Sequence, residues 1–508
     1  METYDAIIVG GGLGGLTAGA RLAKAGRRVL LIEQHNIPGG CATTFKRKDY
    51  VMEVGLHELD GLDETDPKKE IFEALGVFEH VEFIDLPEFY RIGKGEMEIV
   101  IPGATKAAQK VLIERFPQEE RGIKRFFMTI HGIKKDIERL PKQKWKTALL
   151  FPIFPLVYPY LALNTFNTLG KYLDASLKNE ELKLILSANL SYYHDDPYSM
   201  SMIYFSAAQA SFFNGGGHFI RGGSQKLSDY LAKVIEDNGG DVLLNNLVTR
   251  IITKENQAVG VEFKPAFIRD AETKSSYAKV IIANAAVPNV PTMLAEEVRP
   301  LLEKKISGLE KACSILSVYI GFDKEIKELG NRHYSTFIMD ESVNRLGDIS
   351  THYRVDYSKR SFAFVDYSQI DSGLAPKGKS IGVISVLDYL SDWENLDREA
   401  YQRKKQEVAE TLFRRLERLI PGVTKHIECY EVGTPKTIQK FTLNPAGTAY
   451  GFAQIPRQAG LFRLPHKSSI KNLYFASAWT NPGGGFTGAI LSGWSCAAEV
   501  NQMLGKSP

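Results

Sequence analysis

The glycine pattern near the amino terminus constrains the fold more than any other feature of the chain. An apolar, β-prone run at Tyr4–Val9 leads into three glycines with the spacing G-x-G-x-x-G, namely Gly10, Gly12 and Gly15. Leu16–Lys24 then has the helical spacing of apolar residues, and the apolar run Arg28–Ile32 ends at Glu33. This order of strand, glycine turn, helix and strand predicts a βαβ unit that opens an α/β domain.

The residue types in this unit predict a dinucleotide site rather than a glycine-rich turn without a ligand. Gly10 permits the tight turn, Gly12 lets the backbone approach a pyrophosphate, and Gly15 lets the helix pack on the strand. Free N–H groups at the start of the helix can bind the phosphates. Glu33 can accept hydrogen bonds from ribose hydroxyls and would repel a 2′-phosphate. The predicted contacts in this unit are Gly10, Gly12, Leu13, Gly14, Gly15, Glu33 and Gln34.

Length and composition exclude several classes of protein. A chain of 508 residues exceeds the size of a single hydrophobic core, so we expect two domains. Its 63 basic residues are nearly balanced by 60 acidic ones, which argues against a nucleic-acid partner. The 4 cysteines are scattered and the 10 histidines are dispersed, so neither a disulfide framework nor a metal site is predicted. These features, without a visible secretory signal, favour a cytoplasmic location.

A second glycine pattern near the carboxyl terminus points to a flavin. The strand-like run Leu473–Ala476 is followed by "SAWTNPGGGFTG" and by a helix that we expect to begin near Gly488, with Thr487 as its N-cap. The amino end of such a helix can stabilise negative charge at the N1–C2 carbonyl edge of a reduced flavin. The alternative is a tightly packed helix without a ligand. No second strand-linked G-x-G-x-x-G is present, so a separate nicotinamide domain is not expected.

Four stretches of the chain resemble one family along its whole length. They are "IIVGGGLGGLTAGARLAKAGRRVLLIEQ", "PGGCATTF" with "VMEVGLHELDG", "GGGHFIRGGSQKLSDYLAKVIEDNGGDVLLNNLVTRI", and "NLYFASAWTNPGGGFTGAILSG". The chain resembles the phytoene desaturase, carotenoid isomerase and retinol saturase family of FAD-dependent proteins, within the wider amine-oxidase-like group. Cys41 stands where desaturases more often have arginine, which favours the retinol saturase branch. Glu53 replaces the usual aspartate two residues before Gly55.

The resemblance implies FAD as cofactor and further contacts with it. Gly39 and Gly40 resemble a second loop that passes beside the pyrophosphate and ribityl chain. The contacts implied outside the βαβ unit are Gly39, Gly40, Cys41, Val248, Ala283, Ala478, Gly488, Ala489 and Ile490. For Cys41 we favour a small residue packed against the cofactor over a redox agent, because no partner cysteine is close in sequence.

The resemblance also suggests residues close to the flavin ring and the substrate. His57 and Glu58 follow a stretch that lies alongside the ring in the family, where they could orient a hydroxyl or transfer a proton. The alternative for His57 is a satisfied core histidine. Tyr192, Tyr193 and Tyr450 are candidates for the wall of a substrate tunnel, although tyrosines of an ordinary core would look the same in sequence.

The predicted fold is a Rossmann-like FAD-binding domain of the amine-oxidase type, interleaved with a mixed α+β substrate domain. The discontinuous FAD-binding domain is assigned residues 1–69, 214–287 and 444–508, and the substrate domain residues 70–213 and 288–443. We expect an amphipathic helix over Ser224–Asp237 and a long charged helix over Arg398–Leu419. Strands are expected over 242–244, 248–253 and 259–263.

Residues 134–163 form a possible membrane-interfacial segment. Ala148–Leu163 is uncharged, but it is shorter than the roughly 20 residues of a span and contains Pro152, Pro155 and Pro159. The basic residues before it are Lys134, Lys135, Arg139, Lys142, Lys144 and Lys146. Basic residues beside an apolar patch are typical of proteins that enter one leaflet. The expected association is peripheral, and a buried element of the substrate domain is the alternative.

These features together predict flavin chemistry on the C–C or C=C bonds of a long apolar polyene, carotenoid- or retinoid-like. Saturation, desaturation and isomerisation share the same machinery, and the sequence leaves the choice and the electron partner open. An isomerase or hydrogenase of unsaturated fatty acids is the alternative. A lipid-binding relative without redox activity, like the Rab GDP-dissociation inhibitors, is disfavoured by the intact glycine pattern. An amine oxidase would usually have an aromatic cage.

Overall fold

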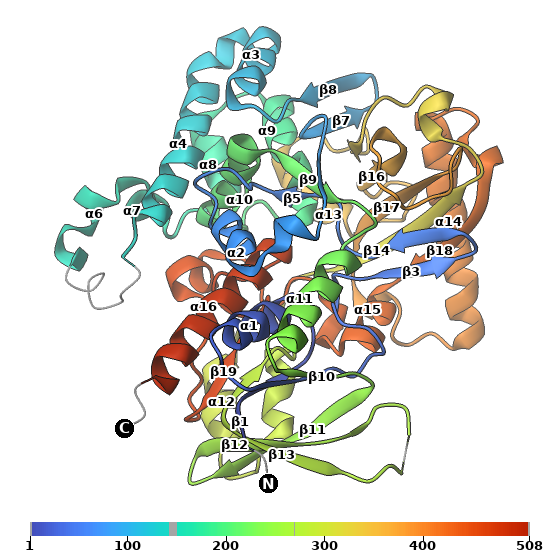
Figure 1. Ribbon diagram of the computed structural model, residues 1–508. Coiled ribbons are helices and arrows are strands. Elements are labelled where there is room, and N and C mark those ends of the chain that lie inside the picture. The colour runs from blue at the N-terminus through green and yellow to red at the C-terminus, as the bar shows by residue number, and fades with distance from the viewer. Residues whose placement is uncertain (1–2, 142–149, 269, 506–508) are drawn as a thin grey trace.

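The computed structural model describes residues 3–141, 150–268 and 270–505, which form two large sheets with helices around them (Figure 1). The strand order of the first sheet is β10–β2–β1–β13–β12–β11, and β19 also pairs with β13. Its strands are β1 (Thr3–Val9), β2 (Val29–Ile32), β10 (Asp241–Leu243), β11 (Asn246–Lys254), β12 (Gln257–Pro265), β13 (Lys274–Ala283) and β19 (Leu473–Phe475). Strands β10, β2, β1, β13 and β19 are parallel, so their carboxyl ends meet at one edge.

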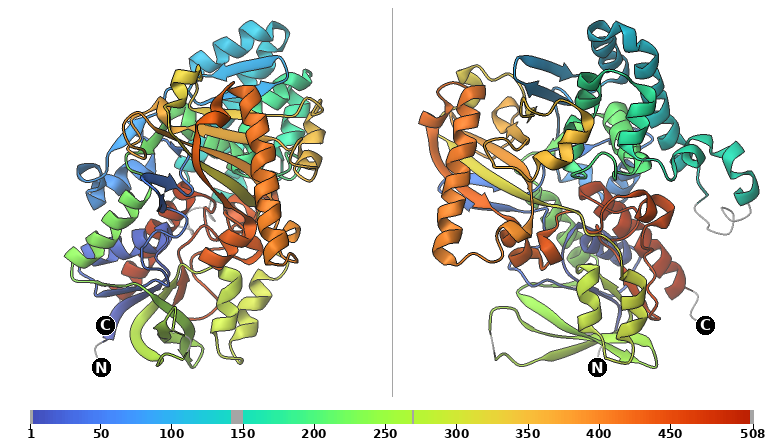
Figure 2. Two further views of the ribbon diagram at one scale, coloured as in Figure 1. Left: turned by 90° about the vertical axis from the view of Figure 1, so that its right-hand side faces the viewer. Right: turned by 180° about the vertical axis from the view of Figure 1, so that it is seen from behind.

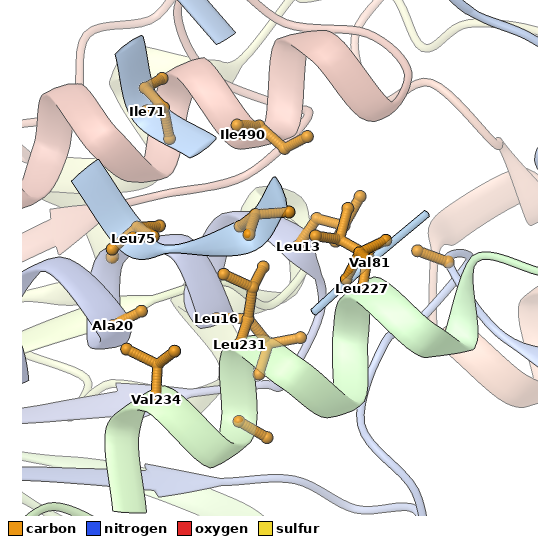
Figure 3. Packing of buried hydrophobic residues seen from close by; sticks show 14 of the residues in the cluster. Leu13, Leu16, Ala20, Ile71, Leu75, Val81, Leu227, Leu231, Val234 and Ile490 are labelled. Carbon is orange, nitrogen blue, oxygen red and sulfur yellow. The ribbon is translucent and has the colours of Figure 1, made fainter. Parts of the chain in front are cut away.

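Three helices pack on this sheet and on one another. They are α1 (Leu13–Lys24), α11 (Gln225–Asp237) and α16 (Phe486–Leu504). Figure 3 shows Leu16 of α1 beside Leu231 of α11, with Ile490 of α16 on the other side of Leu13. A Cβ atom on Gly493 of α16 would lie only 2.2 Å from the backbone oxygen of Gly14, so the two helices approach too closely for a side chain.

The predicted elements of this sheet are present with small shifts in their ends. Helix α1 begins at Leu13, three residues before the predicted start, because the backbone becomes helical directly after the turn at Gly12. The prediction of Thr487 as N-cap is wrong. The N-cap of α16 is Gly485, and Thr487 lies in the first turn, where its hydroxyl donates to Asp60 Oδ1 (2.5 Å).

The second sheet has the order β18–β14–β17–β16–β15–β7–β8. Its strands are β7 (Tyr90–Lys94), β8 (Met97–Ile101), β14 (Ser314–Phe322), β15 (Ser335–Ile338), β16 (Phe362–Asp366), β17 (Ser380–Asp388) and β18 (Ile427–Gly433). Helix α14 spans Arg398–Leu419, as predicted, and packs on one face of this sheet. Along β14, Leu316 and Val318 face α14, whereas Ile315 and Ser317 line a cavity on the opposite face.

Further helices and two small sheets pack around the two large sheets. The helices are α2 (Pro67–Leu75), α3 (Thr105–Arg115), α4 (Glu120–Glu138), α6 (Phe154–Val157), α7 (Pro159–Asn164), α8 (Leu169–Ser176), α9 (Glu180–Leu186), α10 (Met202–Gly215), α12 (Arg299–Ile306), α13 (Ile349–His352) and α15 (Pro435–Thr442). The remaining strands are β3 (Thr44–Arg47), β4 (Tyr50–Glu53), β5 (Leu59–Asp60), β6 (Phe83–Asp85) and β9 (Gly217–Ile220). The mixed α/β architecture agrees with the predicted fold class.

Helices α6 and α7 project from the body of the molecule (Figures 1 and 2). The carboxylate of Asp136, on α4, accepts hydrogen bonds from the backbone N–H groups of Tyr160 and Leu161, which fixes α7 against α4. Of the basic residues predicted to precede a membrane segment, Lys142, Lys144 and Lys146 lie outside the described residues, as does Ala148. Within the described ranges, none of the helices has the length and apolar character needed to cross a bilayer.

Candidate flavin site and substrate cavity

Two glycine loops lie side by side at the carboxyl edge of the first sheet. Gly12 and Gly39 form a parallel bridge, and the N–H of Gly39 donates to the Gly11 carbonyl (2.7 Å). Gly40 has a φ of +62°, and a Cβ atom there would lie 3.3 Å from the Gly12 Cα. The two loops therefore approach each other too closely to leave room for side chains between them.

The helices that begin at this edge have open amino ends. The N-cap of α1 is Gly12, which has no side chain to cap the helix, and the first turn contains no acidic residue. The same is true of α16, whose N-cap is Gly485. Because the first N–H groups of a helix have no partner within it, both ends favour negative charge. The glycine loops and the two open helix ends fit the pyrophosphate and the carbonyl edge of FAD.

Glu33 lies at the end of β2, where its carboxylate is held by the backbone. Oε2 accepts a hydrogen bond from the N–H of Gly11 (2.6 Å), and Oε1 accepts one from the N–H of His35 (2.9 Å). A carboxylate has about four acceptor positions, so sites remain for ribose hydroxyls. Its neighbour Gln34 donates instead to the carbonyl of Phe441.

Replacing Glu33 with glutamine is expected to weaken FAD binding by about 10- to 100-fold, because charge-assisted hydrogen bonds of about 1.5–3 kcal/mol are lost. The dissociation constant is measured by titrating FAD into apoprotein and following flavin fluorescence. Glu236→Gln, at an exposed position on α11, is the matched control. Equal affinity of Glu33→Gln and wild type would show that Glu33 does not bind the ribose.

The other predicted cofactor contacts lie on several elements. Val248 belongs to β11 and packs in one buried cluster with Val9 and Ile32, at the ends of β1 and β2. The remaining contacts are Ala283 at the end of β13, Ala478 after β19, and Gly488, Ala489 and Ile490 in the first turns of α16. Burial raises the pKa of the Cys41 thiol to about 11, so the thiol stays protonated. This state favours packing over redox chemistry for Cys41.

The stretch from Val54 to His57 is fixed by side chains that the sequence did not suggest. Three tyrosine hydroxyls donate to its main-chain carbonyls: Tyr319 to Val54 (3.0 Å), Tyr367 to Leu56 (2.9 Å) and Tyr334 to His57 (2.6 Å). Buried Glu53 accepts hydrogen bonds from the N–H groups of Gly55 and Leu56. These tyrosines lie in or beside strands of the second sheet, so that sheet sets the conformation of this stretch.

His57 and Glu58 both line the cavity, but they differ in protonation. The His57 ring shares hydrogen bonds with the hydroxyls of Tyr192 at Nδ1 (3.1 Å) and Ser385 at Nε2 (3.4 Å). Burial lowers the pKa of His57 to about 4, so its imidazole is neutral near pH 7. Burial, with a further contribution from nearby carboxylates, raises the pKa of Glu58 to about 8. Its buried Oε1 has no hydrogen-bond partner among the residues described.

The cavity has a volume of about 480 Å³ and extends from these two residues to the surface. Tyr192, Tyr193 and Tyr450, the three predicted tunnel residues, line it, as does the amino end of α16. Sequence reasoning missed further lining residues, among them Tyr204, Phe212 and Phe462. These lie far apart in the chain, and no local pattern identifies them.

Comparison with known proteins assigns the chain to a family. The family of flavin-containing amine oxidoreductases matches residues 13–501. The chain belongs to this family. The predicted cofactor, FAD, is thereby confirmed, in agreement with the fit of the glycine loops.

Within the family, relatives with assigned activities cover nearly the whole chain. Prolycopene isomerase 2 of an Oncidium hybrid cultivar is 27% identical over 99% of this chain and 85% of its own length. All-trans-retinol 13,14-reductase of Danio rerio is 26% identical over 98% and 86% of the two chains. A 4,4′-diapophytoene desaturase of Staphylococcus aureus is 25% identical over 98% of both. The predicted resemblance is confirmed by these relatives.

Solved structures of the same fold include an amine oxidase. Cyclohexylamine oxidase from Brevibacterium oxydans superimposes with a TM-score of 0.63 over 99% of this chain and 100% of that chain, at 16% identity. At this identity the similarity describes the fold alone.

Proposed function

We propose that the protein is an FAD-dependent oxidoreductase that acts on the carbon–carbon bonds of a long apolar polyene. The observation that carries the proposal is the largely apolar, aromatic cavity that joins His57, Glu58 and the amino end of α16 to the surface. Ligand cavities of this size and lining suit elongated apolar molecules. The isomerase, reductase and desaturase among the relatives support the same substrate class.

The residues of the chain have separate tasks in this proposal. Bound FAD would supply hydride exchange with the substrate carbon. The aromatic walls exclude water and hold the chain of the substrate in place. His57, neutral and hydrogen-bonded at both nitrogens, positions the neighbouring Tyr192 hydroxyl. Glu58, protonated at neutral pH, holds the proton that a saturated product requires.

Anaerobic incubation of the holoprotein with a panel of polyenes tests this function. A desaturase would bleach the flavin and give a product lighter by two hydrogens. A saturase, with its flavin first reduced, would reoxidise the flavin and give a product heavier by two hydrogens. An isomerase would change the retention time without a change in mass. If no polyene changes, and an amine reduces the flavin instead, the proposal is wrong.

We further propose that the mouth of the cavity contacts a membrane. Leu461 (61% exposed) and Phe462 (47%) line the cavity, and Leu163 (79%) and Phe166 (68%) are exposed at and just after the end of α7. The rings of Phe166 and Phe462 stack at 5.5 Å, which joins two segments that are far apart in sequence. Exposed apolar groups at the entrance to an apolar cavity favour shallow insertion into one leaflet. The predicted membrane segment therefore extends, in this proposal, to residues 460–462.

Replacing these four mouth residues with serine is expected to lower binding to liposomes by about 10-fold or more. Full burial of one large apolar side chain in the bilayer would contribute about 1.5–3 kcal/mol to the free energy of binding. Binding is measured by co-sedimentation with anionic vesicles. Leu301→Ser, at a 45% exposed position on α12 of the FAD-binding side, is the control. Loss of flavin from the quadruple variant, or unchanged co-sedimentation, would contradict membrane contact at the mouth.

A further inference from the structure

One wall of the cavity is charged, in contrast to the apolar walls elsewhere. Five charged residues from two regions line it: Asp60, Asp66 and Lys68 around the start of α2, and Lys134 and Glu138 on α4. The wall lies close to the flavin site, because Asp60 accepts the hydrogen bond from Thr487 at the start of α16. Asp66, Lys68 and Lys134 are buried, and a buried charge is costly unless it is paired, so the partners of each lysine must be identified.

The positive charge of Lys68 is balanced by two carboxylates of the protein itself. Its ammonium lies 2.7 Å from Asp66 and 3.4 Å from Asp60, and the side chain is buried. Asp66 also accepts from the Ser211 hydroxyl and from the N–H of Leu62. The polar atoms of Lys68 and Asp66 therefore have partners within the protein, and this closed group needs no ligand.

Lys134 is different. Its side chain is only 10% exposed, and its nearest carboxylate, that of Glu138, lies 3.9 Å away, beyond hydrogen-bond distance. Among the described residues its ammonium donates no hydrogen bond. Lys134, one of the basic residues predicted to precede a membrane segment, thus lines the cavity and is not exposed on the surface. The N–H groups of this ammonium are therefore available to donate hydrogen bonds to a polar group of a ligand.

The charges around Lys134 determine which polar group of a ligand can bind there. Asp60, Asp63 and Glu138 lie within electrostatic reach of Lys134, and the closed Asp60–Lys68–Asp66 group is itself negative by one charge. A carboxylate ligand would meet this acidic excess, and a hydrocarbon end would leave the ammonium without a partner. A hydroxyl can accept a hydrogen bond from Lys134 and donate one to a carboxylate.

We propose that this charged wall binds the terminal hydroxyl of a long-chain polyene alcohol, with Lys134 as donor and Glu138 as acceptor. The inference rests on the proposed function and narrows its substrate class from polyenes in general to polyene alcohols. It assigns Lys134 and Glu138 to specificity, separate from the groups beside the flavin.

The test compares three probes that differ only at one end: all-trans-retinol, the corresponding hydrocarbon with a methyl in place of the hydroxymethyl group, and all-trans-retinoic acid. Their dissociation constants for the holoprotein are measured by quenching of tryptophan fluorescence. We expect wild type to bind the alcohol at least about 10-fold more tightly than the hydrocarbon or the acid. The alcohol alone can form the hydrogen bonds to both Lys134 and Glu138.

Variants at the wall separate recognition of the end group from general binding. Lys134→Met is expected to weaken binding of the alcohol by about 10- to 100-fold, to leave the hydrocarbon unaffected, and to keep the flavin spectrum. Lys135→Met, at the next and exposed position of α4, is the matched control. Should Lys134→Met fail to fold, the wild-type preference among the three probes still decides the question.

Two outcomes overturn the inference while leaving the proposed function in place. They are equal binding of alcohol and hydrocarbon by wild type, and unchanged affinity of Lys134→Met for the alcohol, in each case with a probe that reacts at the flavin. Failure of all three probes to bind would also overturn the inference, whereas the proposed function is decided separately by the panel of polyenes.

Discussion

Replacing Gly12 with valine is expected to give a folded protein that retains no FAD. The backbone at Gly12 has φ −73° and ψ 169°, a conformation that valine adopts without strain. A Cβ atom there would meet only the side-chain nitrogen of Asn284, at 2.8 Å, and that end of the side chain can move aside. The valine methyl groups would instead occupy space beside the backbone of Gly12, where the pyrophosphate must approach.

A control variant and a folding measurement show whether the loss of FAD from Gly12→Val is specific. Gly103→Val places the same side chain where no atom lies within 4 Å, so flavin content should equal that of wild type. Circular dichroism and the melting temperature of the apoprotein establish that Gly12→Val folds. Gly15 is unsuitable for this purpose, because its Cβ would lie 2.3 Å from the Gly10 carbonyl oxygen and would disrupt the turn itself. A yellow Gly12→Val protein with wild-type FAD content would show that the pyrophosphate lies elsewhere.

Glu58→Gln is expected to slow saturation of the substrate by about 10²- to 10⁴-fold, the usual contribution of a positioned general acid. Glutamine keeps the size of the side chain and its hydrogen-bonding capacity, but it cannot deliver a proton. FAD content should be unchanged, since Glu58 lies on the cavity wall and not in the glycine loops. The rate is measured in single turnovers, with prereduced holoprotein mixed with substrate, and Glu236→Gln again serves as the surface control.

The pH dependence gives a second, independent readout for Glu58. Its pKa is raised to about 8, so the proton is present below that pH and is lost as the pH rises through it. The wild-type rate should therefore fall above about pH 8, and the Glu58→Gln variant should lack this decline. The pKa of His57 is lowered to about 4, so His57 adds no change between pH 5 and 8. A wild-type decline centred near pH 4, or one that persists in the variant, would contradict the role of Glu58.

The parts of the fold that could be predicted are those encoded by local pattern. The βαβ unit and the helix Arg398–Leu419 follow from apolar spacing and glycine position within a short window. The N-cap of α16 could not be placed from the sequence, because it is the last of three consecutive glycines and only the fold decides where the helix begins. The position of Lys134 in the cavity wall could not be predicted, because it depends on how α4 packs against α10 and α7.

In the candidate site, too, some features could be predicted from the sequence and others depend on the fold. His57 and Glu58 could be picked out by resemblance, but their opposite protonation depends on burial, which only the folded chain establishes. The tyrosines that hold the carbonyls of Val54, Leu56 and His57 come from positions roughly 260 to 310 residues further along the chain. Contacts at that separation leave no periodic signal in the sequence.

The pairing of α1 with α16 has a consequence for how the protein matures. Domains generally fold as their residues leave the ribosome, starting from the amino terminus. Helix α11 follows α1 by about 200 residues, whereas the second helix that covers α1 begins only at Phe486, and β19 begins only at Leu473. The nascent chain must therefore carry the part of α1 that α16 covers exposed until the last of these residues are made. Cofactor loading becomes a late event, and chaperones that shield exposed apolar helices should set the yield of holoprotein.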